Sequence, residues 1–263
     1  HMGTKPVVPL IFSLSAPVML SLAVQALYNI IDSIYISHYS GSGLAALSLA
    51  FPVQTLITAV ASGTGVGTNI LIAKALGASE EEKASSFVLH GFLLSLLNWA
   101  AFVIIGMLLL KPYFSIFSAS SEVANMGIIY LRIILIGSVA PFIENVAVKI
   151  LQAAGNSVSP MIFQSFAAVI NLILDPLFIW GFGVIPQMGI SGAAIATVFA
   201  QFISAALSVF TVFFRQNILR ISLLKFHISP KYIKEIFITG LPSVLGMALV
   251  SVYISGLNAI LSS

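Results

Sequence analysis

The 263-residue sequence contains no cysteine and little charge. Without cysteine, disulfides, thiol catalysis and thiolate metal sites are excluded. Charged residues make up only 7% of the chain, against roughly 25% in soluble domains. Hydrophobic residues make up 59%, and a composition this apolar also excludes disorder. We therefore predict an integral membrane protein, because a chain of this kind cannot hide its apolar surface as an ordinary cytosolic enzyme does.

Seven apolar stretches are long enough to cross a bilayer core, which takes about 20 residues. They are Leu10–Ile36, Leu44–Ala73, Phe87–Leu110, Ala124–Ala154, Pro160–Phe182, Gly192–Phe214 and Ile236–Leu261. Prolines inside four of these stretches predict kinks: Pro17, Pro52, Pro141 and Pro176. The predicted fold class is an all-α membrane protein, with a six-helix transmembrane lobe followed by a seventh transmembrane helix.

The expected organisation has four parts. Residues 1–9 form an N-terminal tail, in which His1–Met2 is interpreted as a remnant of expression. Residues 10–214 form the six-helix lobe, residues 215–235 a basic cytoplasmic linker, and residues 236–263 the first helix of a second, truncated lobe.

Lysine and arginine are distributed unevenly between the two ends of the predicted spans. If the helices alternate in direction, one side collects Lys5, Lys74, Lys83, Lys149, Arg215, Arg220, Lys225, Lys231 and Lys234. The opposite side collects only Lys111 and Arg132. Because cationic residues accumulate on the cytoplasmic side, this asymmetry predicts a multi-pass protein of the cell membrane with a cytoplasmic N-terminus.

The seventh span weakly repeats the first. Ser15–Ser33 and Gly240–Asn258 align at a shift of 225 residues, which pairs Pro17 with Pro242 and Tyr28 with Tyr253. The resemblance between two apolar helices is as consistent with chance as with a repeat. A true repeat would place six helices between the copies, so both copies would insert in the same direction, as in transporters with parallel repeats.

Three acids stand inside predicted spans: Asp32, Glu144 and Asp175. A charged side chain at mid-bilayer costs about 2.5–3.5 kcal/mol on insertion scales, so each acid needs a structural or functional reason. At a rise of about 1.5 Å per residue, the two aspartates fall in the outer half of the membrane. Glu144 falls in the inner half together with Lys149.

Other oxygen-bearing side chains fall at the depth of the aspartates. Tyr28 precedes Asp32 by four residues and Asn171 precedes Asp175 by four residues, so each pair shares a helix face; Thr197 lies at a similar depth on the sixth span. No lysine or arginine lies on those faces. Oxygen ligands suit hard cations, and one of two close, buried carboxylates can hold a proton near neutral pH. We therefore predict a site for Na⁺ or a proton.

Purely structural roles for these residues remain open as alternatives to the ion site. Asp32 could face the lipid headgroups. Asp175–Pro176 could be a kink with no ligand, since Pro176 cannot donate to the preceding turn and frees a carbonyl oxygen. Glu144 with Lys149 is more readily a structural pair or an interfacial group than a catalyst, and His90 is more readily a packed histidine than a proton relay. The glycines of Ser62–Asn69 (SGTGVGTN) predict close helix packing rather than a phosphate cradle, because no strand precedes them.

Six motifs in order resemble one transporter family across essentially the whole chain. They are Ala16–Pro17, YNIID (28–32), LGASEEEKA (76–84), QAAGNSVSP (152–160), NLILDPLFIWG (171–181) and GISGAAIATVFAQ (189–201). Together they resemble the first lobe of a multidrug and toxic compound extrusion (MATE) transporter, of the prokaryotic DNA-damage-inducible-type branch. The family's members usually have twelve helices in two lobes around a cleft. They exchange H⁺ or Na⁺ for bulky, often cationic drugs.

The resemblance implies a cation site at Asp32, Asn171, Asp175 and Thr197, with Tyr28 as a neighbour. The choice of Thr197 among nearby hydroxyls rests on the resemblance. Pro17 would match a proline at which the first helix bends in some members, and Pro176 is the second predicted bending residue. No cofactor is expected beyond the coupling ion, Na⁺ or H⁺, and a metal site would be this Na⁺ site alone.

The predicted function is a cation-coupled multidrug efflux antiporter, present here as its N-terminal half, and not an enzyme. Its expected partners are small organic, cationic drugs, the lipid bilayer, and a missing C-terminal lobe or a second copy; nucleic acid is not expected. Two alternatives stay open. One is a flippase for lipid-linked oligosaccharides, and the other is a non-transporting membrane module that acts only with a partner half.

Overall fold

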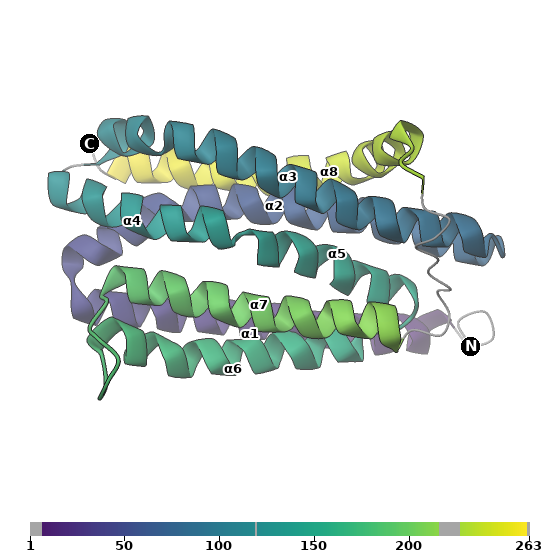
Figure 1. Cartoon of the computed structure of the whole chain (residues 1–263), viewed down its shortest axis with the longest axis horizontal. Helices are drawn as coiled ribbons and strands as arrows, with labels where there is room; N and C mark the ends of the chain where they lie inside the picture. The colour runs from purple at the N-terminus through teal and green to yellow at the C-terminus, as the bar shows by residue number, and fades with distance from the viewer. Residues whose placement is uncertain (1–6, 119, 216–226, 262–263) are drawn as a thin grey trace.

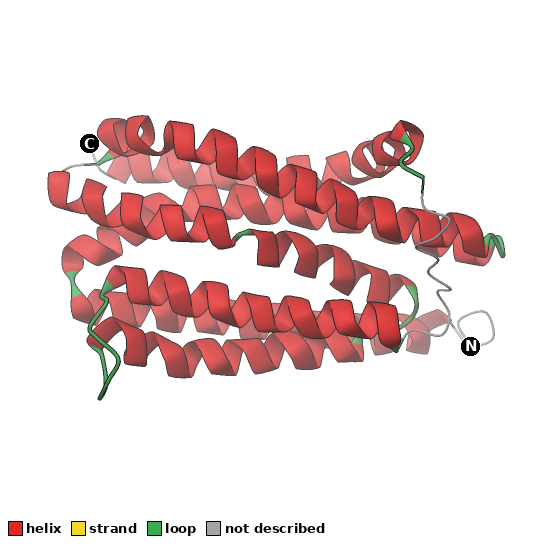
Figure 2. Ribbon diagram, viewed as in Figure 1, coloured by secondary structure: helices red, strands yellow, loops and turns green. Residues whose placement is uncertain are grey.

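A computed structural model describes residues 7–118, 120–215 and 227–261 of the chain. In these ranges the chain is almost entirely helical (Figures 1 and 2). The helices are α1 (Val7–Tyr39), α2 (Gly41–Gly77), α3 (Glu81–Phe117), α4 (Ser121–Gly137), α5 (Val139–Ala153), α6 (Val158–Trp180), α7 (Ile190–Phe214) and α8 (Pro230–Leu261). The predicted all-α membrane fold is confirmed.

Six of the seven predicted spans coincide with single helices, and the fourth does not. Six helices are long and apolar enough to cross a membrane, or up to seven spans when the bent pair α4 and α5 is taken as one. The axes of α4 and α5 differ by 44° across the break at Ser138. Pro141 explains the position of the break, because it cannot donate to the carbonyl of Gly137 one turn earlier.

The helices lie side by side along the long axis of the molecule, and the connections lie at its two ends (Figures 1 and 2). The N-terminal end also holds the turns after α2 and α5 and the start of α8. Because α1 and α8 both start at this end, they run in the same direction, as two copies of a parallel repeat would.

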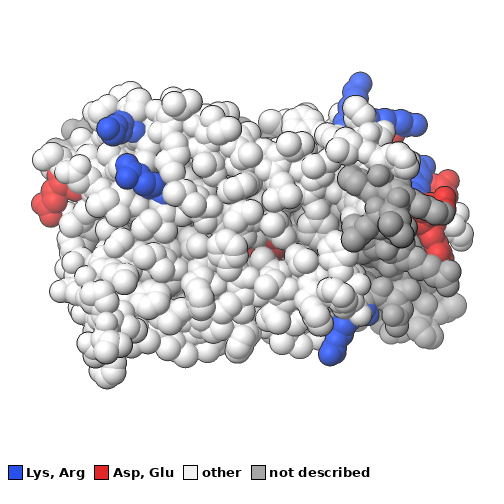
Figure 3. Space-filling view, in the orientation of Figure 1, with Lys and Arg blue, Asp and Glu red and all other residues white. Residues whose placement is uncertain are grey.

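The surface between the two ends is apolar. Large hydrophobic side chains point outward on most helices; Leu108 is 73% exposed and Leu249 70% exposed. Charged side chains gather at the two ends of the face in Figure 3, and only a small group of acidic atoms shows in its middle. An apolar belt between charged ends is the surface that a bilayer requires.

Glycines let α2 approach two neighbours closely. A Cβ added to Gly63 would overlap the Val244 side chain of α8, and one added to Gly67 would overlap the backbone carbonyl of Ile236. Gly65 instead faces α5, where an added Cβ would meet Lys149 and the backbone of Asn145. The predicted packing role of this glycine motif is confirmed, and it fixes α8 against the six-helix lobe.

His90 has the packed position expected from the sequence. It is 1% exposed, and its Nδ1 lies 2.7 Å from the backbone oxygen of Ser86. Its Nε2 accepts a hydrogen bond from the backbone N–H of Ser229 at 2.9 Å. These bonds tie α3 to the start of α8.

Candidate functional site

The two aspartates of the sequence lie on adjacent helices inside the lobe. Asp32 of α1 is 7% exposed and Asp175 of α6 is 1% exposed, and α1 packs against α6. Their carboxylates are near enough to act on each other electrostatically. Neither forms an ion pair with a lysine or arginine in the described ranges. The burial of Asp32 contradicts the alternative in which it faces the headgroups.

Asn171 connects Asp175 to α7. Its Nδ2 donates to Oδ1 of Asp175 at 3.1 Å and approaches Oγ1 of Thr197 at 3.5 Å. The spacing of four residues between Asn171 and Asp175 aligns them on α6, as predicted. The structure therefore brings Asn171, Asp175 and Thr197 into one cluster beside Asp32.

Three oxygens of this cluster are buried and accept no hydrogen bond from any described group: Asp32 Oδ1, Asn171 Oδ1 and Asp175 Oδ2. A buried oxygen without a partner is costly. Two carboxylates and an amide supply the hard oxygen ligands that suit Na⁺, and the carboxylates can equally accept a proton. The donor set therefore fits a small monovalent cation. In the described ranges no group of three or more His, Cys, Asp or Glu side chains could hold a metal ion, so the amide and hydroxyl are needed to complete the set.

A polar cavity adjoins the cluster. It has a volume of about 190 Å³, enough for several water molecules. Asn171 and Thr197 line it, so the candidate cation site opens onto it. Its other lining residues are contributed by α1, α2, α5, α6, α7 and α8.

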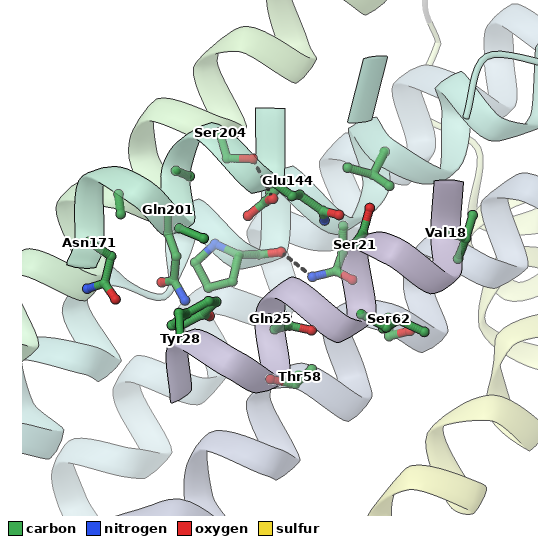
Figure 4. Close-up of a pocket in the computed structure, with 18 of the residues that line it drawn as sticks. Val18, Ser21, Gln25, Tyr28, Thr58, Ser62, Glu144, Asn171, Gln201 and Ser204 are labelled. Carbon is green, nitrogen blue, oxygen red and sulfur yellow. Dashed lines mark hydrogen bonds between the residues drawn. The ribbon is translucent and has the colours of Figure 1, made fainter. Parts of the chain in front are cut away.

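Polar side chains at helical spacing form the walls. On α1 the lining residues Ser21, Gln25 and Tyr28 follow one another at intervals of three or four, and Asp32 comes four residues later. On α7 the same spacing joins Thr197, Gln201 and Ser204. Figure 4 shows Asn171, Gln201 and Glu144 pointing into the space between the helices. A polar stripe in an apolar helix is the signal that could have identified Gln201 and Ser204 from the sequence.

Two tyrosines flank the aspartates, and sequence reasoning identified only one. Tyr28, predicted as a neighbour, lines the cavity and interacts electrostatically with both aspartates. Tyr130 of α4, not predicted, is 1% exposed and interacts with the same aspartates. Its hydroxyl accepts a hydrogen bond from Nε2 of Gln54 at 2.8 Å. Its place depends on the packing of α2 and α4 against each other, which no local motif encodes.

Glu144 and Lys149 do not form the structural pair that the sequence left open. Oε1 of Glu144 accepts a hydrogen bond from Ser204 Oγ at 2.6 Å, and Nζ of Lys149 donates to Oε1 of Gln152 at 3.0 Å. Five residues separate them, which turns their side chains about 140° apart on an ideal helix. Both line the cavity, but from different sides of α5.

The two predicted bending residues both lie within continuous helices, Pro17 in α1 and Pro176 in α6. Pro176 directly follows Asp175, whose carboxylate belongs to the cluster. Asp175–Pro176 is therefore part of a buried polar cluster, in contrast to the alternative in which it is only a helix kink.

The MatE family model matches residues 17–177, more than half of the chain. This chain belongs to the MatE family. The match includes Asp32, Asn171 and Asp175 of the candidate site and ends before α7. Matched family members and structures are membrane transporters rather than enzymes, and the chain is a member of a multi-pass membrane transporter family.

Curated relatives align with this MatE chain over much of its length. An FAD transporter of Shewanella oneidensis is 28% identical over 216 residues, covering 82% of this chain and 48% of the relative. The probable multidrug resistance protein NorM of Thermotoga maritima is 27% identical over 236 residues, covering 89% of this chain and 50% of the relative. The chain thus spans about half the length of the curated relatives it matches.

A solved structure of a MATE transporter has the same fold over about half of its length. The outward-facing conformation of a multidrug resistance MATE family transporter of the MOP superfamily matches with a TM-score of 0.87 at 32% identity. The match covers 95% of this chain and 55% of that one. The packed helices of this MatE chain therefore correspond to about half of a MATE transporter.

Proposed function

We propose that this chain is the cation-binding lobe of a MatE exporter that exchanges H⁺ or Na⁺ for small organic molecules carrying a positive charge. The observation that carries the proposal is the pair of buried aspartates on α1 and α6, each with one unpartnered carboxylate oxygen, beside the unpartnered amide oxygen of Asn171. Two neighbouring negative charges in an apolar lobe are stable only when a cation or proton joins them. A site of this kind has the chemistry needed to couple ion flow to transport.

The coupling would use the cavity beside the aspartates. Ion binding can shift a transporter between shapes only if the two shapes bind the ion with different affinity. Asp32 lies on the same helix as Pro17, and α1 lines the cavity. Bending of α1 at Pro17, when the aspartates are neutralised, would change the shape of the cavity and release its cargo.

A complete exporter would need more chain than this one. The alignments cover only 48% and 50% of the two curated relatives, one of which is a probable multidrug resistance protein. We infer that the lobe works with a partner half, either a C-terminal lobe or a second copy. The excess of lysine and arginine at the N-terminal end supports a cytoplasmic N-terminus. The six motifs between Ala16 and Gln201 support membership of the DNA-damage-inducible-type branch.

Equilibrium binding of ²²Na⁺ to the purified chain tests the cation site. Because Na⁺ and protons would compete for the same oxygens, bound Na⁺ should fall when the pH is lowered from about 8 to about 6. Asp32→Asn and Asp175→Asn should each abolish the bound Na⁺, and Glu122→Gln, on the exposed start of α4, should not. If the site takes only protons, no Na⁺ binds, and a titrating protonated carboxyl signal should instead be lost or shifted by either aspartate substitution. Na⁺ binding that survives both aspartate substitutions would refute the proposed site.

A further inference from the structure

The cavity holds an acid and an amine that do not touch. Glu144 and Lys149 both line it, yet no ion pair joins them in the described structure. Their separation by five positions on α5 corresponds to about 7.5 Å along the helix and about 140° around it. The Glu144 and Lys149 side chains therefore lie on different sides of the same cavity.

Hydrogen bonds with uncharged partners hold each group in place. Ser204 of α7 donates to the Glu144 carboxylate at 2.6 Å, and Gln164 of α6 also interacts with it. Lys149 donates to Gln152 at 3.0 Å, while the Lys149 backbone carbonyl accepts from Asn69 of α2 at 2.7 Å. These partners orient the side chains without cancelling their charge. Glu144 is 8% exposed, so it has little water to compensate for the missing counter-charge.

Each group would gain from a ligand that brings the opposite charge. A buried ion without a counter-ion is unfavourable, and a hydrogen-bonded partner of opposite charge offsets that cost better than an uncharged partner does. A simple cation would satisfy Glu144 but would meet the positive charge of Lys149. A simple anion would satisfy Lys149 but would meet Glu144. A single ligand can pair with both Glu144 and Lys149 only if it carries both charges and holds them apart.

We propose that this cavity binds small zwitterions, with an ammonium group at Glu144 and a carboxylate at Lys149. The proposal rests on the proposed function in taking the cavity as the cargo site, and it adds a negative end to the positively charged cargo. A volume of about 190 Å³ lies below the roughly 300–1,000 Å³ of drug-sized sites, so the ligand is compact. A rigid spacer must separate its charges, because the two residues face different walls.

Three matched probes test the charge requirement on the unaltered chain. 4-(Aminomethyl)benzoate carries both charges, its methyl ester carries only the ammonium, and its N-acetyl derivative carries only the carboxylate. Titration calorimetry of the purified chain should show the zwitterion binding at least tenfold more tightly than either single-charge probe. Glycine, whose charges share one carbon, should bind more weakly than the aromatic zwitterion. Equal affinities across the three aromatic probes, or binding of none, would overturn the proposal.

Substitutions then assign each charge to its residue. Glu144→Gln should remove the preference for the zwitterion over the N-acetyl probe, and Lys149→Gln should remove the preference over the methyl ester. Lys149→Arg should keep the preference. Glu122→Gln and Lys111→Gln, which alter exposed groups, are matched controls and should bind like the parent chain. A variant that fails to fold leaves the probe series on the parent chain as the deciding result.

Ion binding on the same preparation separates this inference from the cation site. If the aspartates take up Na⁺ or protons as expected while the three probes bind equally, the zwitterion assignment is wrong and the cation site stands. If the zwitterion binds selectively while Asp32→Asn and Asp175→Asn leave ion binding unchanged, the cation site is wrong and the charge assignment in the cavity stands.

Discussion

Asn171 donates through Nδ2 to Oδ1 of Asp175, 3.1 Å away and one turn further along α6. The bond holds one carboxylate oxygen and leaves the other, Oδ2, buried without a partner. The same amide approaches Thr197 of α7. A side chain without charge thus orients the acid and joins two helices, while the acid keeps a free oxygen for an ion.

Removing the Thr197 hydroxyl should weaken ion binding without abolishing it. Thr197→Val takes away one oxygen of the set and the acceptor that Asn171 approaches, a loss of roughly 1 kcal/mol or about fivefold in affinity. Thr197→Ser keeps the oxygen and should bind like the parent. The measurement is ²²Na⁺ binding, or carboxyl titration if the ion is a proton. An unchanged affinity in Thr197→Val would exclude Thr197 from the site.

The absence of cysteine makes the orientation directly testable. Ala78 in the turn after α2 and Val184 in the loop after α6 lie at opposite ends of the molecule (Figure 1). In intact cells a membrane-impermeant maleimide should label Val184→Cys and should label Ala78→Cys only after permeabilisation. The reverse pattern would place the N-terminus outside.

The close packing of α2 on α8 should depend on Gly67. A Cβ there would overlap the Ile236 backbone, and backbone cannot move aside as a flexible side chain can. Gly67→Ala should therefore destabilise the fold by about 1–3 kcal/mol, seen as a lower thermal midpoint in detergent. Gly246→Ala is the matched control on α8, because a Cβ there meets nothing within 4 Å. Equal midpoints for the two variants would contradict the packing described here.

Much of the fold follows from hydrophobic length alone. An apolar run of about 20 residues has few alternatives to a spanning helix in a membrane protein, and each predicted stretch contains helix in the described ranges. The sequence predicts bending at Pro141, and the break lies three residues earlier, at Ser138. A proline indicates that a hydrogen bond is lost, but packing decides where the axis turns.

The sequence predicts those site residues that recur at helical spacing or that place a charge inside a membrane span. Asp32 and Asp175 stand out because membrane spans rarely contain charge, and a spacing of four residues finds Asn171. Tyr130 was not predicted because its position depends on contacts between helices, such as its hydrogen bond with Gln54 of α2. The spacing of residues within one helix does not reveal contacts with another helix. The structural pair of Glu144 and Lys149, one of the two interpretations open from the sequence, does not form, because a separation of five residues turns the two side chains about 140° apart on a helix.

Carboxyl titration followed by infrared spectroscopy shows whether Asp32 and Asp175 share one ion-binding pocket. The protonated carboxyl absorption of the purified chain is recorded against pH in a Glu144→Gln background, which removes the other buried acid. We predict a protonated carboxyl signal that titrates, that is lost or shifted by either Asp32→Asn or Asp175→Asn, and that Na⁺ reduces if Na⁺ is the coupling ion. A signal that neither substitution alters, or two aspartates that titrate independently of each other, would contradict the account.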